Sequence, residues 1–310
     1  MALEPIIQKP EITLAKSAGL PIRVVRNVIN AVRLILRTTS GRIGFPIVII
    51  HAVIAGFGSW LAPYSATEFN FDLQGNIYQL LAPSSQFLLG TDQFGRDILS
   101  RVMSGSTSLV LVAGSGTLIG ITAGAMIGMG AAYVGKWADE IVMRFMDGLM
   151  SFPSLLLALL VISTLGPNVL FIVLTVGIVT VPGVARVMRS TTLALKEQEF
   201  IQSARLRGES AAYIVFREIF PNTLPIIGVE LAVRLSYAIL IVSSLGFLGL
   251  GVQPPSPDWG LMISQGRQFL ATSPWITLSP AVAVASLVVG VNLLTDGIQQ
   301  ARNLPKEDES

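Results

Sequence analysis

Long stretches without a charged side chain constrain this sequence more than any other feature. The five longest are residues 43–67, 102–135, 148–185, 235–257 and 268–295. A helix needs about 20 apolar residues to cross the hydrocarbon of a bilayer, and each stretch exceeds that length. Only 13% of the 310 residues are charged, against about 25% in a soluble domain, and the mean hydropathy is +0.67. The sequence therefore predicts an integral membrane protein.

The third stretch is long enough for two helices, because Gly166, Pro167 and Asn168 interrupt it. Six transmembrane helices are therefore expected, at residues 43–62, 106–134, 145–165, 169–189, 225–249 and 276–298. An open sheet cannot satisfy its backbone polar groups in lipid, so the spans must be bundled helices. We expect an all-α membrane protein.

Lysine and arginine residues predict the orientation. With the N-terminus inside, seventeen of the 21 fall in cytoplasmic segments and three outside, as the positive-inside rule requires. Both termini and the segment 196–225 are thus expected in the cytoplasm. That segment reads KEQEFIQSARLRGESAAYIVFREIFPNTLP, with four basic and four acidic residues between two apolar stretches. A mixed-charge loop of this length indicates a docking role.

The chain before the first span, residues 1–42, is expected to be a cytoplasmic tail. Within it, residues 21–37 have arginines on one helical face and aliphatic side chains on the other, which is typical of an amphipathic helix lying in the membrane interface. The first span contains His51, the single histidine. It is interpreted as a neutral side chain bonded inside the bundle, with a proton relay as the alternative.

Four glycines recur at every fourth position of the second predicted span: Gly116, Gly120, Gly124 and Gly128. Such a ridge of small residues lets another helix approach the backbone closely. The spacing predicts a tight helix contact. It leaves open whether the partner helix belongs to this chain or to another.

Charged residues inside the predicted spans need a partner or water. Asp147, near the start of the third span, is expected to pair with an arginine, and Pro153 can kink that helix. Glu230 and Arg234 lie four residues apart on one face of the fifth span. Two interpretations stay open for this pair: a lock between helices, or a polar lining of a transport pathway.

Several functions are made improbable by what the sequence contains. There is no cysteine, which excludes disulfides and cysteine-based metal or redox sites. A P-loop-like run ends at Lys136, but Trp137 stands where the pattern needs Ser or Thr. The net charge of +2 does not indicate a nucleic-acid partner. Before the second span, two carboxylates alternate with Arg96 and Arg101, which predicts an ion-paired surface helix instead of a metal site.

Four stretches together resemble the permease subunits of bacterial ATP-binding-cassette importers of the peptide/nickel group, in particular the C-type subunits of dipeptide and oligopeptide permeases. The stretches are LGTDQFGRDILSRVMSG, MRFMDGLMSFPSLLLA, the segment 196–225 and LGFLGLGVQPPSPDWG. The resemblance implies a type I ABC-importer permease fold preceded by an elbow helix. It divides the chain into a tail (1–42), a first helix with a periplasmic loop (43–105), a core transmembrane domain (106–301) and a second tail (302–310).

In this family the segment 196–225 is the loop that couples the permease to an ATPase. The family pattern is Glu-Ala-Ala, three residues, Gly, nine residues, Ile-x-Leu-Pro. This chain matches it at Ala204, Gly208 and Pro221 and departs from it at Gln202, which replaces the leading Glu, and at Ser203, Glu218 and Phe220. Phe200, Ile201 and Ala204 share one side of a short helix, which predicts an apolar knob for a groove on the ATPase. The coupling residues implied are Phe200, Ile201, Gln202, Ser203, Ala204, Gly208 and Pro221.

The resemblance also implies partners and function. The chain would pair with a second, dissimilar permease, two cytoplasmic ATPases and an external substrate-binding protein in the inner membrane of a bacterium. It would bind no cofactor and catalyse no reaction, since ATP and Mg²⁺ belong to the ATPases. The cargo would be a di- or oligopeptide, a nickel chelate, glutathione or an opine. The alternatives are a secondary transporter driven by an ion gradient, with carboxylates such as Asp296 in its spans, and a scaffold without transport.

Overall fold

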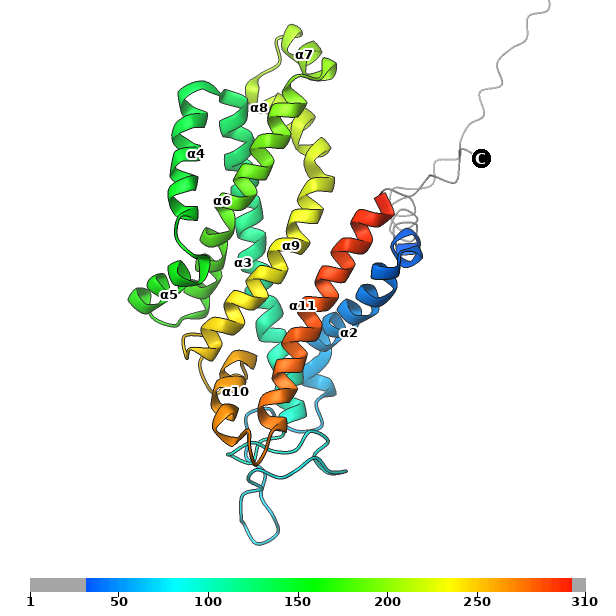
Figure 1. Cartoon of the computed structure of the whole chain (residues 1–310), viewed down its shortest axis with the longest axis vertical. Coiled ribbons are helices and arrows are strands. Elements are labelled where there is room, and N and C mark those ends of the chain that lie inside the picture. The colour runs from blue at the N-terminus through cyan, green and yellow to red at the C-terminus, as the bar shows by residue number, and fades with distance from the viewer. Residues whose placement is uncertain (1–31, 303–310) are drawn as a thin grey trace, which may run out of the picture.

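The computed structural model describes residues 32–302, and within that range the chain is helical, with two isolated β-bridges in place of any sheet (Figure 1). The long helices are α2 (Thr39–Leu61), α3 (Ile98–Val134), α4 (Lys136–Met150), α5 (Ser154–Leu165), α6 (Val169–Lys196), α9 (Phe220–Phe247) and α11 (Trp275–Arg302). The short ones are α7 (Glu199–Leu206), α8 (Ala211–Tyr213), a π-helix η1 (Ile214–Ile219), α10 (Trp259–Gly266) and a 3₁₀ turn η2 (Arg267–Phe269). The expected all-α class is confirmed.

Five of these helices are long and apolar enough to cross a membrane, and α4 with α5 makes a sixth span if the bent pair is counted as one. The prediction of one helix over 145–165 needs correction, because the two parts meet at 84°. The break falls at residues 151–153. Pro153 has no N–H to donate and disfavours a helical conformation in the residue before it. A proline expected to kink the span interrupts it instead.

Several predicted spans are too short at their ends. Helix α3 begins at Ile98, eight residues early, because the Asp97 carboxylate caps it by accepting from the Ser100 N–H at 2.8 Å. Helix α6 continues to Lys196. Pro221 does not end a short helix: it is the second residue of α9, which continues directly from the π-helix η1. A proline inside a continuous helix lacks one backbone donor, and the hydrogen-bonding pattern changes from π to α at this point.

Helix α3 runs through the middle of the bundle (Figure 1) and packs most extensively against α6. On its other side α2 and α11 form a second close pair, and α9 contacts α3, α6 and α11. The buried apolar residues form two clusters along this axis. The first lies among α3, α5, α6, α9, α10 and α11, and the second lies among α3, α6, α7 and η1. The α7–α9 segment is therefore joined to the bundle by a core of its own.

The four spaced glycines of α3 face α6 of the same chain. A Cβ added at Gly116 would lie 2.7 Å from Val176 Cβ, and one at Gly120 would lie 2.5 Å from Thr180 Cβ. At Gly128 the added atom would collide with the Ala185 carbonyl oxygen. The ridge thus brings the two backbones together within this subunit, which answers the question that spacing alone left open.

The N-terminal side of the bundle is described only from residue 32. Most of the predicted amphipathic helix over 21–37 lies outside the described residues. Its described part, residues 32–37, is helical. In α2, His51 is buried and its Nε2 lies 2.9 Å from the Ser286 hydroxyl of α11. This hydrogen bond agrees with a histidine bonded inside the bundle.

The cluster of carboxylates and arginines before α3 is buried in a turn. Asp92 lies 2.8 Å from Arg96 Nε and 3.5 Å from Arg101 Nε, and all three residues are less than 10% exposed. The ion pairs are as predicted, but the surface helix is not. Gly90 and Gly95 adopt positive φ angles of 76° and 72°, which turn the chain there in a way that other residues rarely can.

A short helix, α10, closes the same end of the bundle, just after the Gly- and Pro-rich residues 246–257. Asp258 caps it by accepting from the Leu261 N–H at 2.8 Å, and burial raises the pKa of the Asp258 carboxyl. The Trp259 indole donates to the Val102 carbonyl at 2.8 Å and covers Gly105 of α3. The Asp-Trp-Gly sequence therefore has a structural role, because it holds α10 against α3.

Candidate coupling segment and central cavity

The segment 196–225 lies at the opposite end of the molecule from the loop 62–97 (Figure 1). Helix α6 ends at Lys196, α7 follows after two residues, and the chain then turns toward η1 and α9. The turn is at Gly208, whose φ is +76°. No heavy atom lies within 4 Å of a Cβ built there, so the glycine is required by backbone conformation and not by lack of space.

The apolar side of α7 faces this subunit and not the solvent. Ile201 and Ala204 are 0% exposed and pack in the same cluster as Ile214 and Ile219 of η1. Only Phe200, at 38%, is partly exposed. The interpretation of Phe200, Ile201 and Ala204 as one knob for a partner is therefore corrected for two of the three residues, because their contacts are already made within the chain.

The outward side of α7 presents a different apolar residue. Leu206 is 90% exposed, and Gln202 and Ser203 are exposed near it on the same helix. Sequence reasoning missed Leu206, although a signal was present: it is the one large aliphatic residue that lies off the Ile201 and Ala204 side of a helix. Water-exposed leucine at a helix end is apolar surface that a partner could cover.

A basic and aromatic contact fastens this segment to the end of α3. The Lys196 ammonium donates to the carbonyls of Ala132 and Tyr133 at 2.8 and 3.1 Å, so it satisfies two acceptors left open where α3 ends. The Arg205 guanidinium of α7 lies 5.5 Å from the centre of the Tyr133 ring, within range of a cation–π interaction. Tyr133 therefore connects α3, α6 and α7.

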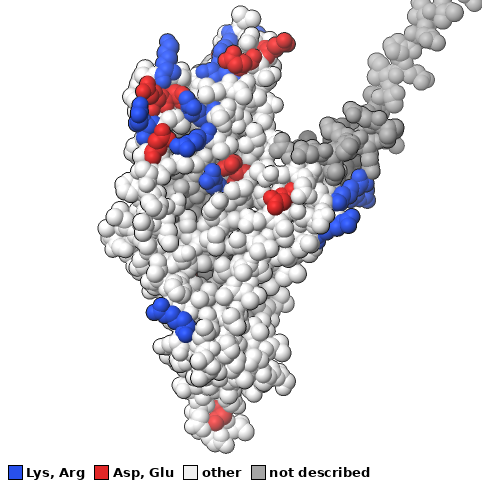
Figure 2. Space-filling model, in the orientation of Figure 1, with Lys and Arg blue, Asp and Glu red and all other residues white. Residues whose placement is uncertain are grey.

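Ion pairs between α4 and α6 surround the same end of the bundle. Arg189 holds Asp139 with two hydrogen bonds of 2.6 Å each, and Arg186 lies 2.5 Å from Asp147. Asp147 thus has an arginine partner, as its position indicated. Figure 2 shows that charged side chains gather over α4 and α7, while most of the rest of the visible face is uncharged.

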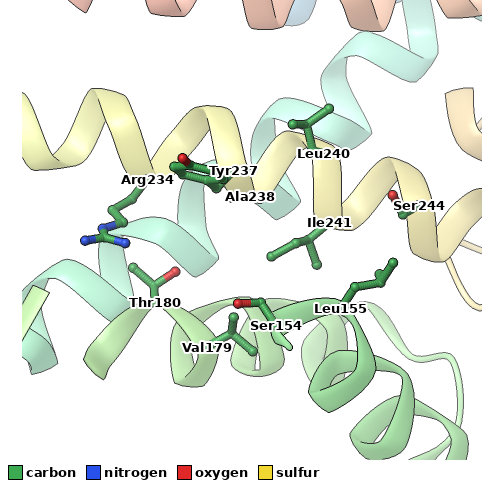
Figure 3. A pocket seen from close by; sticks show the side chains of 10 residues that line it. All are labelled: Ser154, Leu155, Val179, Thr180, Arg234, Tyr237, Ala238, Leu240, Ile241 and Ser244. Atoms are coloured by element: carbon green, nitrogen blue, oxygen red, sulfur yellow. The ribbon is translucent and has the colours of Figure 1, made fainter. Parts of the chain in front are cut away.

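A cavity of about 420 Å³ opens between α5, α6 and α9 (Figure 3). Its lining residues are Ser154, Leu155, Val179, Thr180, Arg234, Tyr237, Ala238, Leu240, Ile241 and Ser244. Apolar side chains supply most of the wall, and hydroxyl groups and one guanidinium supply its polar points. The break between α4 and α5 helps to form the cavity, because it turns α5 so that Ser154 and Leu155 face α9 (Figure 3).

Arg234 pairs with Glu230 at 3.0 Å within the same helix, α9. The pair therefore does not lock two helices together by its own hydrogen bond, which was one of the two interpretations. The arginine lines both this cavity and an adjoining one of about 110 Å³. Its side chain is 26% exposed and that of Glu230 15%. Among the described residues, no group of three or more His, Asp or Glu is placed to hold a metal ion.

Comparison with known protein families identifies the family of this chain. The family model of the binding-protein-dependent transport system inner membrane component matches residues 116–303. The chain belongs to this family. The match covers most of the core, from the glycine ridge of α3 through the coupling segment to the end of α11.

Individual relatives of this permease extend the match toward the N-terminus. A glutathione transport system permease protein from Escherichia coli O6:K15:H31 is 39% identical over 255 residues, 82% of each chain, and one from Shigella boydii serotype 4 is equally similar. A dipeptide transport system permease protein from Alkalihalophilus pseudofirmus is 36% identical over 259 residues, 84% of each chain. The chain is thus a membrane permease subunit of an ABC importer of the peptide/nickel group, and the secondary-transporter alternative is not supported.

Proposed function

We propose that this permease is driven by a cytoplasmic ATPase that docks on α7, and that it forms half of the pathway for a small peptide or a related solute. The observation that carries the proposal is the two-sidedness of α7. Its inner side is buried at Ile201 and Ala204, while its outer side exposes Leu206. A helix that packs against the bundle on one side and is exposed to solvent on the other can transmit a displacement from a docked partner to the membrane spans.

The residues of the coupling segment take two roles in this proposal. Those facing the ATPase are Phe200, Gln202, Ser203 and Leu206, and those holding the segment in place are Ile201, Ala204, Gly208 and Pro221. The Arg205–Tyr133 contact joins α7 to α3, and the Lys196 hydrogen bonds join the end of α6 to α3. A displacement of α7 would therefore be transmitted to α3 and, through the glycine ridge, to α6.

The cavity between α5, α6 and α9 is the part of the pathway that this subunit supplies. Tyr237 and Leu240 of α9 line it while remaining 60% and 46% exposed. Large exposed side chains beside a cavity indicate that another subunit completes the wall, and we propose a second, dissimilar permease there. The remaining apolar surface of the bundle would contact lipid.

The orientation proposed is the one that the basic residues favour, with both termini and α7 in the cytoplasm and α10 outside, in the inner membrane of a bacterium. The binding protein would then deliver cargo at the α10 end. ATP and Mg²⁺ would be bound by the ATPases, and this chain would bind no cofactor. Glutathione and dipeptides are proposed as cargo because they are named for the relatives.

Reconstitution tests this function directly. The chain is assembled in liposomes with the second permease, ATPases and binding protein encoded by neighbouring genes, and uptake of labelled glutathione and alanyl-alanine is measured. We expect uptake of at least one probe that requires both ATP and the binding protein. Uptake driven by an ion gradient through the chain alone would contradict the proposal.

A further inference from the structure

We infer that Arg234 is a specificity-determining residue that binds the free carboxylate of the solute as it passes through the cavity. This inference rests on the proposed function, because it assigns a task within the pathway. It concerns the chemical class of the cargo: a small peptide or peptide-like solute with an unblocked carboxyl group. Four observations support it, beginning with the geometry of the guanidinium.

Only one edge of the Arg234 guanidinium is occupied. Its Nε donates to Glu230 Oε2 at 3.0 Å, and Nη1 and Nη2 have no hydrogen-bond partner among residues 32–302. A guanidinium presents five N–H donors in a fixed plane. The two terminal nitrogens are therefore available to a ligand while the side chain is held in place by the glutamate.

A glycine makes room for this arrangement. A Cβ added to Gly183 of α6 would lie 2.6 Å from Arg234 Nη1 and 2.7 Å from Nη2. The guanidinium thus lies directly against the α6 backbone, at the junction of the two cavities. An arginine that served only as a partner for Glu230 in its own helix would not need to lie against the backbone of the facing helix α6.

The surroundings of Arg234 favour an anion over a cation. Among the described residues that line either cavity, Arg234 alone has an ionised side chain, and Glu230 lines neither of them. The hydroxyls of Ser154, Tyr237 and Ser244 line the same space (Figure 3). Arginine pairs with carboxylates through parallel N–H···O bonds, and hydroxyls can hydrogen-bond to the remaining polar groups of a peptide.

The glutamate beside the arginine suits a transport pathway. By neutralising part of the charge of Arg234, Glu230 weakens the attraction for an anion without removing it. A solute in a pathway must bind well enough to enter and weakly enough to leave. A bare arginine would hold a carboxylate more strongly and would slow its release.

The test compares two forms of one probe in the complete reconstituted importer. ATP-driven uptake is measured for alanyl-alanine and for its C-terminal amide, with Arg234→Gln and Arg234→Lys against the unaltered chain. The binding protein is the same throughout, so its own preference cancels when the acid-to-amide uptake ratio is compared between variants. We expect Arg234→Gln to lower this ratio about tenfold, the effect of losing about 1.4 kcal/mol of charge-assisted bonding, and Arg234→Lys to lower it less.

Two further variants keep the test decisive if Arg234→Gln folds poorly. Gly183→Ala should lower the ratio by displacing the guanidinium, whereas Gly228→Ala, a glycine of α9 with no atom within 4 Å of an added Cβ, should not. A ratio that stays unchanged in Arg234→Gln and Gly183→Ala, while the unaltered chain transports the dipeptide, would overturn the role of Arg234 alone. Failure of the unaltered complete importer to take up any probe with ATP would contradict the proposed function itself.

Discussion

Gly128 is the point where the backbones of α3 and α6 come closest among the four spaced glycines, against the carbonyl of Ala185. Two residues further along the same helix, Gly130 has no heavy atom within 4 Å of an added Cβ. The two glycines share a helix but differ completely in their surroundings. They therefore separate the cost of packing from the cost of changing a helical glycine.

Replacing Gly128 with valine should destabilise the protein by about 2–3 kcal/mol, because the added atoms force α3 and α6 apart. Gly130→Val is the matched control and should cost less than about 1 kcal/mol. The thermal midpoint of the purified protein in detergent measures both. Equal midpoints for the two variants would mean that the helices do not pack as described.

Individual side chains show what the sequence could and could not predict. The glycine spacing identified a contact surface, but spacing carries no information about which helix is opposite. The helical spacing of the apolar residues in α7 correctly placed Ile201 and Ala204 on the same side. It could not tell whether that side met a partner or the chain's own η1, because an apolar helical face looks the same in both cases. Leu206 was missed because it is a single leucine between two arginines, and one apolar residue forms no repeating pattern that would mark a contact surface.

Helix ends and breaks were harder to predict than helix positions. Each of the six predicted spans contains helix, yet α3 and α6 extend well past the predicted bounds. Lipid thickness sets only a minimum length, and caps such as that of Asp97 decide where a helix begins. The 84° break at Pro153 also depends on packing, since a proline can produce a mild kink as readily as a full interruption.

The contact between α7 and α3 yields a prediction about coupling. Tyr133→Leu keeps the apolar packing of this residue but removes the ring that the Arg205 and Lys196 cations face. We expect the number of solutes taken up per ATP hydrolysed to fall by about two- to fivefold, as suits a loss of about 0.5–1 kcal/mol per cation–π contact. Tyr133→Phe retains the ring and should stay close to the unaltered chain. A similar loss in both variants would assign the effect to the hydroxyl.

The subunit is organised as a bundle with two differently built ends. Buried ion pairs and the Trp259 contact with α3 close one end, while exposed charges and the coupling segment form the other (Figures 1 and 2). Family membership and five of the six spans could be predicted from the sequence, because long apolar stretches and local motifs suffice for both. The cavity could not, since its wall is assembled from α5, α6 and α9 and depends on how they pack.

The central claim is that an ATPase drives this permease through the outer side of α7, and Leu206 tests it most directly. The measurement is ATP-driven uptake by the complete importer with Leu206→Glu, beside Leu206→Met as the matched control. A buried charge without a partner is costly at an interface, so Leu206→Glu should reduce both ATPase binding and uptake by at least tenfold. Leu206→Met should leave both nearly unchanged, and the exposed position predicts that both variants fold. Normal ATPase binding and uptake by Leu206→Glu would contradict the claim.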